Sequence, residues 1–127
     1  PIMIGAKGPK MLRLAALKAD IWSWFVEERS DITEFAPRLA ALVAACEDSG
    51  RDPGTIGKSA GVVVEPTSVG GSEAEFGTPI RGSAEAIADA LRTFGAAGFT
   101  NLELVVWPPN PATLDAMAPV IELLDAG

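Results

Sequence analysis

The residues best suited to chemistry lie near the start of the chain, in the turn from Gly5 to Pro9, which follows a short apolar run. Glycines at such a turn let the backbone come close to a ligand, and a helix that starts here directs its free N–H groups at that ligand. The helix dipole favours an anion at this end, and Lys7 adds a positive charge. The pattern therefore fits a phosphate-binding site, but it also fits a tight turn between a strand and a helix.

A second candidate is the pair of indole rings at Trp22 and Trp24, in the apolar run DIWSWF. Residues two apart on a strand share one face, so both rings point the same way if this run is extended. At the carboxyl end of a strand they could wall a cofactor ring or a substrate. Packing against a helix explains the same pair more simply, and the sequence leaves both interpretations open.

A third candidate is Arg81, at the end of a long polar stretch that is rich in glycine. The stretch is too long for an ordinary connection and contains few apolar residues, so residues 66–82 are expected to form a mobile loop. Arg81 could bind an anionic substrate there. It could equally be a solvated side chain at the start of the following helix.

Composition excludes several kinds of chemistry. The 127 residues contain no histidine and only one cysteine, Cys46, so no Ser-His or Cys-His pair, ordinary zinc site or internal disulfide is expected. The formal net charge of −7 repels nucleic acid. No apolar stretch is long enough for a bilayer and no leader is recognisable, so we expect a cytoplasmic protein with no membrane partner. No base–nucleophile or carboxylate pair can be assembled, so no catalytic residue is assigned.

These candidates must be positioned by short strands that alternate with helices. Strands are predicted at Ile2–Ala6, Asp20–Phe25, Lys58–Glu65 and Asn101–Trp107. Helices are predicted to begin after the candidate caps Gly8, Asp31 or Thr33, Ser83, and Asn110 or Thr113, and Pro119 is expected to bend the last one. The alternation predicts one α/β domain over residues 1–127, made of four β/α units with parallel strands and outer helices.

The first and last predicted strands lack the lysines and prolines that protect exposed sheet edges. Such strands are expected to be paired on both sides. Four β/α units with unprotected edges are typical of half a (β/α)8 TIM barrel, which needs about 250 residues, although a small doubly wound sheet has the same order of elements. The chain starts at Pro1 rather than methionine, which suggests processing or truncation. We therefore expect a homo-oligomer or pairing with a missing N-terminal half.

Three segments carry a resemblance to a known family. They are PIMIGAKGPKMLRLAALKADIWSW, GRDPGTI and GSAEAIADALRTFGAAGFTNLELVVWPP, in that order along the chain. Together they resemble the C-terminal half of the luciferase-like monooxygenase superfamily, whose members are (β/α)8 barrel oxidoreductases that use FMN or the deazaflavin coenzyme. The resemblance implies that the four strands are the fifth to eighth of such a barrel.

The resemblance also implies a cofactor site, because the family binds the phosphate of its cofactor at the corresponding turn. Gly8 and Pro9 match the family's motif, whereas Lys7 replaces the commoner glycine, and Ile21 replaces a glycine that usually precedes the aromatic residue. With the resemblance added to the reasoning from the residues, the candidates for cofactor binding are Gly5, Ala6, Lys7, Gly8, Trp22 and Trp24, and Arg81 is the candidate for substrate binding.

The function implied is the cofactor-phosphate-binding half of a flavin- or deazaflavin-dependent oxidoreductase acting on a small-molecule substrate. Many catalytic groups of the family come from its first four strands, so this chain is not expected to be an active enzyme alone. One alternative is a non-catalytic half-barrel that self-associates as a structural or ligand-binding module. Another is a small domain that binds a phosphorylated sugar at the same turn.

Overall fold

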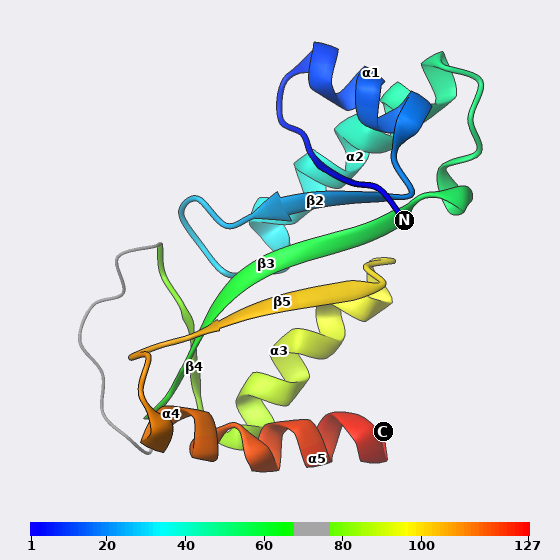
Figure 1. The fold of residues 1–127 in the computed structure, drawn as a ribbon. Coiled ribbons are helices and arrows are strands. Elements are labelled where there is room, and N and C mark those ends of the chain that lie inside the picture. Colours follow the sequence, from blue (N-terminus) through cyan, green and yellow to red (C-terminus); the bar gives the residue numbers. More distant parts are fainter. Residues whose placement is uncertain (68–76) are drawn as a thin grey trace.

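The computed structural model describes residues 1–67 and 77–127 and shows a twisted parallel sheet with helices packed along it (Figure 1). The elements are β1 (Met3–Gly5), α1 (Pro9–Lys18), β2 (Ile21–Phe25), α2 (Ile32–Asp48), the 3₁₀ turn η1 (Pro53–Thr55), β3 (Gly57–Pro66), β4 (Ile80–Gly82), α3 (Ala84–Ala96), β5 (Asn101–Val106), α4 (Pro111–Ala116) and α5 (Ala118–Ala126). Each predicted strand and helix start is found, which confirms the α/β class.

Consecutive β/α units lie side by side in the sheet. β2 pairs with β1 on one side and with β3 on the other, and β5 pairs with the free side of β3, all in parallel. Ser23, Ser59 and Asn101 stand opposite one another across the three neighbouring strands. Within the described part of the chain, β1, β5 and the short strand β4 each pair with one strand only, so each has an open edge.

The structure corrects the prediction of four strands, because β4 lies inside the range 66–82 that was expected to be a loop. Val64 pairs with Ile80 on one side and with Val106 on the other, so β4 lies across β3 from β5. It continues the position of β2 beyond the end of that strand. Residues 68–76, on which most of the mobile-loop prediction falls, lie outside the described residues.

The helix starts follow the predicted capping chemistry. Of the two candidate caps for α2, Asp31 is the one used, and its carboxylate accepts the backbone N–H of Thr33 at 2.9 Å. Ser83 caps α3 and Asn110 caps α4 in the same way. The expected bend near Pro119 is a break between α4 and α5, since proline has no N–H to continue the hydrogen bonding of the helix.

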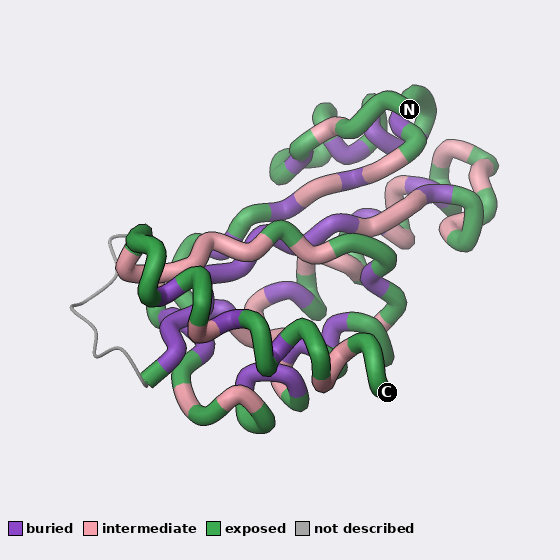
Figure 2. Tube along the Cα trace, turned by 60° about the horizontal axis from the view of Figure 1, so that its bottom comes forward, coloured by how far each residue is buried: buried purple, intermediate pink, exposed green. Residues whose placement is uncertain are grey.

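The core lies between the sheet and the helices. β3 is central and is buried from Ser59 to its end, as Figure 2 shows along the middle of the tube. The ring of Phe99 packs edge to face against Phe35, with centroids 5.8 Å apart, and tilted against Trp22, with centroids 6.3 Å apart. Cys46 is fully buried beside this core, and burial raises the pKa of its thiol. Among the described helices, none combines the length and the apolar character needed to cross a bilayer.

Candidate functional site

The turn between β1 and α1 is held in place by an indole ring from β2. Trp22 donates its Nε1–H to the carbonyl oxygen of Ala6 at 3.0 Å, and both residues are buried. This bond ties the turn that follows β1 to Trp22, the second residue of the neighbouring strand β2. Trp22 is fully buried, as the packing interpretation expects, and its part in cofactor binding stays a prediction.

The N-terminus of α1 has backbone donors available. The first helical hydrogen bond runs from the N–H of Leu12 to the carbonyl of Gly8 at 2.9 Å. In the described part of the chain, the N–H groups of Gly8, Lys10 and Met11 have no acceptor. A Cβ atom built on Gly8 would have no heavy atom within 4 Å, so the space before the helix is open. These amides can bind an anion.

A pocket of about 380 Å³ lies next to this turn, at the carboxyl ends of β1 and β2. Its lining residues are Gly5, Ala6, Lys7, Ser23, Trp24, Phe25, Val26 and Glu27. The structure therefore brings four of the six predicted cofactor residues together in one pocket. Gly8 stands at the adjacent helix start, whereas Trp22 lies behind the pocket in the core.

Lys7 is engaged by a partner that the sequence did not indicate. Its Nζ lies 2.5 Å from Oε1 of Glu27 and 5.5 Å from the centroid of the Trp24 ring. Arg38 lies over the same ring at 4.6 Å and contacts Oε2 of Glu27 at 3.7 Å. The hydrogen bond from Lys7 lowers the pKa of Glu27, and burial opposes this only in part. The charge of Lys7 is thus largely balanced by Glu27.

Trp24 differs from Trp22 in its hydrogen bonding. Its side chain is also buried, but its ring lines the pocket and its Nε1–H has no partner in the described structure. A buried donor without a partner costs free energy, so such groups usually have an explanation. The prediction that Trp24 walls a ligand ring stays open, and its indole N–H is buried without an acceptor among the described residues.

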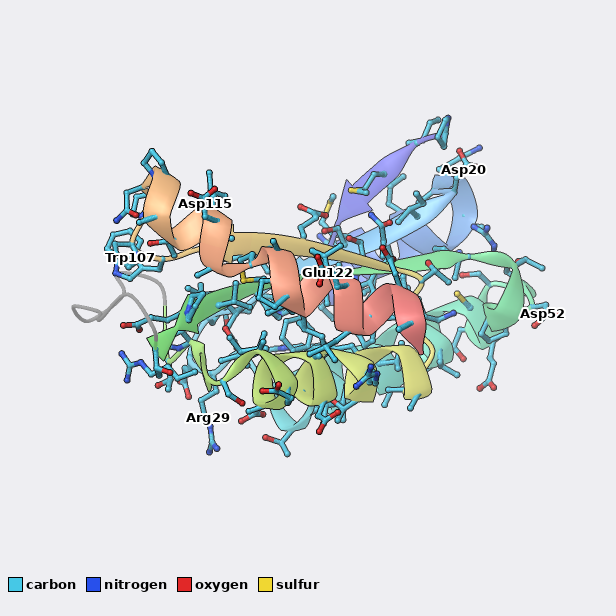
Figure 3. The ribbon with its side chains drawn as sticks, turned by 90° about the horizontal axis from the view of Figure 1, so that it is seen from below. Asp20, Arg29, Asp52, Trp107, Asp115 and Glu122 are labelled. Atoms are coloured by element: carbon cyan, nitrogen blue, oxygen red, sulfur yellow. The ribbon has the colours of Figure 1, made fainter. Side chains whose placement is uncertain are left out.

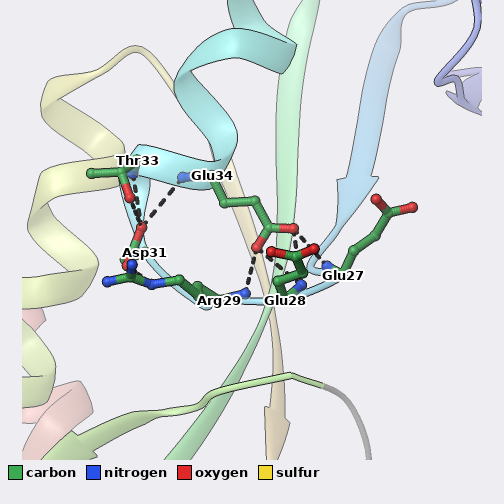
Figure 4. A network of polar contacts seen from close by, with 6 residues as sticks. All are labelled: Glu27, Glu28, Arg29, Asp31, Thr33 and Glu34. Carbon is green, nitrogen blue, oxygen red and sulfur yellow. Dashed lines mark hydrogen bonds and ion pairs between the residues drawn. The ribbon is translucent and has the colours of Figure 1, made fainter.

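The loop after β2 is organised by one carboxylate, that of Glu34 (Figure 4). It accepts the backbone N–H groups of Glu27 at 2.8 Å, Glu28 at 3.1 Å and Arg29 at 2.7 Å. Glu34 stands three residues after the cap Asp31, the spacing of a capping box, but its carboxylate bonds to the preceding loop and not to the backbone of Asp31. Because three amides of the loop converge on Glu34, this residue holds Glu27 within reach of Lys7.

Asp31 completes this network by bonding to the first turn of α2. Its carboxylate accepts the hydroxyl of Thr33, contacts the side chain of Arg29 at 3.0 Å and accepts the backbone N–H of Glu34 at 3.3 Å. The hydrogen bond from Thr33 is the main cause of its lowered pKa. The β2–α2 loop is therefore held by two carboxylates, those of Glu34 and Asp31.

Arg81 lies apart from this pocket. Its Nε donates to Oε2 of Glu65 at 2.7 Å, and the Glu65 side chain is only 5% exposed. The two residues stand opposite each other where β3 pairs with β4. Arg81 therefore neutralises a buried carboxylate, and substrate binding by Arg81 stays a prediction.

The face of the sheet opposite the helices carries a small polar cluster. Oε1 of Glu103 accepts hydrogen bonds from the hydroxyl of Ser59 at 2.7 Å and from that of Ser23 at 3.4 Å. The three side chains come from three adjacent strands. This cluster was not identified from the sequence, because the two serines become neighbours of Glu103 only in the folded sheet.

No protein-family model matches the chain, and no curated protein is similar enough to match. Among solved structures, an F420-dependent secondary alcohol dehydrogenase in complex with an F420-acetone adduct aligns with a TM-score of 0.71 and 14% identity, over 98% of this chain and 48% of that one. A coenzyme F420 dependent tetrahydromethanopterin reductase from Methanopyrus kandleri aligns with a TM-score of 0.69 and 16% identity, over 94% and 48%.

The chain thus spans about half the length of these two structures, and at these identities the likeness shows the fold alone. It confirms the expectation of an α/β half-domain, whose fold corresponds to about half of each of these structures. The parallel order β1, β2, β3 and β5 is the order that one half of a (β/α)8 barrel has.

Proposed function

We propose that this chain is the part of a deazaflavin-dependent oxidoreductase that binds the phosphate of the cofactor. The observation that carries the proposal is the open N-terminus of α1, with unpaired amides at Gly8, Lys10 and Met11 beside the pocket at the ends of β1 and β2. Both structural neighbours are named for coenzyme F420, so the deazaflavin has support that FMN lacks.

The residues present fit such a group. A phosphate needs several donors and a close approach of the backbone, and the amides of α1 with the open space at Gly8 supply both. An aromatic ring of the cofactor needs an apolar wall, and Trp24 offers one together with an unpartnered indole N–H. When bound, the deazaflavin supplies hydride-transfer chemistry, and these residues bind and orient it.

Lys7 has a choice of partners in this proposal. It now pairs with Glu27, whose carboxylate also contacts Arg38. An arriving phosphate competes with Glu27 for the ammonium group, while Arg38 remains to balance the released carboxylate. Glu27 therefore weakens the attraction of this end of the sheet for anions and makes binding depend on a rearrangement of one ion pair.

The substrate in this proposal is a small molecule, and the reacting groups are not found among the residues described above. Arg81 is retained as a candidate for binding an anionic substrate, with Glu65 as the partner from which it would have to be shared. Activity of a whole enzyme then depends on groups beyond this chain's pocket.

Fluorescence titration of the chain with coenzyme F420 tests the proposal. Gly8→Val places a branched side chain in the space before α1, and we expect it to weaken binding by at least about tenfold. Gly95→Val is the matched control, because Gly95 also has open space around its Cβ position but lies in α3. Equal binding of F420 by the Gly8→Val variant and the unmodified chain contradicts the assignment, and so does the absence of binding by both.

The charge of Lys7 is tested in the same titration. Lys7→Ala is expected to weaken binding by about 1 to 3 kcal/mol and to reduce its dependence on salt. Glu27→Gln removes the competing carboxylate and is expected to strengthen binding. If both variants bind like the unmodified chain, Lys7 takes no part in holding the phosphate.

A further inference from the structure

The edge of the sheet at β1 is flanked by exposed apolar side chains. Ile2 and Met3 are exposed on the strand, and beside it Met11 and Leu14 of α1 are 44% and 42% exposed. Such a patch next to an unpaired strand marks an interaction surface.

Helical periodicity shows where the patch on α1 points. Positions 11, 14 and 18 share one face, because they are spaced i, i+3 and i+7. Leu12, by contrast, faces the core, and Arg13 lines the groove between α1 and α2. The face formed by Met11, Leu14 and Lys18 therefore points away from α2, toward the open edge of the sheet.

The opposite edge, at β5, has a similar arrangement. Leu114 of α4 and Ile121 of α5 are exposed, and they lie seven residues apart along this pair of helices. A hollow of about 450 Å³ lies between β5 and the start of α4, lined mainly by apolar side chains that include Val105 and Leu114. An edge strand and an apolar helix face thus lie together here too.

The helices at the two edges carry opposite charges. The charged residues of α1 are Lys10, Arg13 and Lys18, all basic. Those of α4 and α5 are Asp115, Glu122 and Asp125, all acidic, and Figure 3 shows Asp115 and Glu122 on the outer side of these helices. The two edges of the chain are therefore complementary to each other in charge as well as alike in apolar character.

We propose that two copies of this chain associate through these edges, with β1 and α1 of one copy against β5 and α5 of the other. Both contacts form at once about a two-fold axis, so the β1 and β5 edges of both copies are paired, and β1, β2, β3 and β5 of the two copies close into a ring of eight strands with β4 of each copy outside it. Two copies also supply about the length of one structural neighbour, of which this chain spans 48%. The association does not depend on the proposed cofactor.

Sedimentation velocity at micromolar concentration, with circular dichroism to check folding, tests this proposal. The unmodified chain is expected to be a dimer. Leu14 is exposed in the single chain, and each copy places its Leu14 in one of the two contacts. Leu14→Glu therefore adds a charge to both contacts, and we expect the folded variant to dimerise at least about 100-fold more weakly. Leu17→Glu is the matched control, because Leu17 follows Arg13 by four residues and lies on the side of α1 away from the edge.

A charge exchange tests the pairing of unlike edges. Lys18→Glu and Asp125→Lys are each expected to weaken the dimer severalfold, and the double variant is expected to recover it. If the unmodified chain is a folded monomer, the proposal is overturned. The partner of these edges is then a different half-barrel and not a second copy of this chain. A dimer that resists Leu14→Glu, or that is lost equally with Leu17→Glu, also overturns it.

Discussion

Replacement of Trp22 by phenylalanine is the sharpest test of how the turn before α1 is built. The substitution keeps an aromatic ring in the core but removes the donor to the carbonyl of Ala6, which lies at 3.0 Å and is buried. A buried acceptor that loses its only strong partner costs about 1 to 3 kcal/mol. The smaller ring leaves a cavity that adds about 1 kcal/mol. We therefore expect Trp22→Phe to lower the free energy of unfolding by about 2 to 4 kcal/mol.

Trp24→Phe is the matched control for this prediction. Trp24 is on the same strand and is also buried, but its indole N–H has no partner among the residues described. The smaller ring leaves a similar cavity and weakens the contacts with Lys7 and Arg38 by about 0.5 kcal/mol. Since the substitution also removes an unsatisfied donor, its cost is expected to be about 1 to 3 kcal/mol lower than that of Trp22→Phe.

Urea unfolding followed by far-ultraviolet circular dichroism measures the difference without relying on tryptophan fluorescence. All three proteins are compared at one concentration, because association would shift apparent stability. A gap of this size also corresponds to a difference of several degrees in Tm. Equal losses of stability in the two variants, or a larger loss in Trp24→Phe, would refute the claim that the indole of Trp22 holds the turn.

Two further predictions concern the loops near the pocket, and both are measured by urea unfolding. Asp31→Ala is expected to lower the free energy of unfolding by about 1 kcal/mol at neutral pH. Because the fold lowers the pKa of Asp31, its carboxylate stabilises the fold fully above the ordinary pKa range of an aspartate, and this stabilisation is lost as the pH falls through the folded pKa. The unmodified chain should therefore lose more stability in acid than the variant. Identical acid sensitivity of the two proteins would contradict this. Gly77→Ala is expected to lower the free energy of unfolding more than Gly50→Ala does. Both glycines have positive φ, but only at Gly77 would an added Cβ lie 2.8 Å from a backbone oxygen, that of Glu28. A larger loss in Gly50→Ala would show that this contact is not limiting.

The class and order of the main elements could be predicted from the amino-acid sequence alone. Strand β2 was recognisable from its apolar run, and Asp31 and Ser83 marked helix starts, because such signals depend on neighbours within a few residues. The turn from Gly5 to Pro9 was recognisable as a possible anion site for the same reason. β4 was not recognisable, since three residues carry no period and the strand exists through its pairing with β3.

The assembly of the site, in contrast, could be seen only in the folded chain. Trp22 and Trp24 are equivalent in sequence pattern, yet one supports the turn and the other lines the pocket, because Ala6 lies within reach of only the first indole. The pairing of Lys7 with Glu27 joins residues 20 positions apart. It depends on the parallel pairing of β1 with β2 and on the three amides that Glu34 holds, and contacts of this kind arise from the packing of separate elements, which no local pattern encodes.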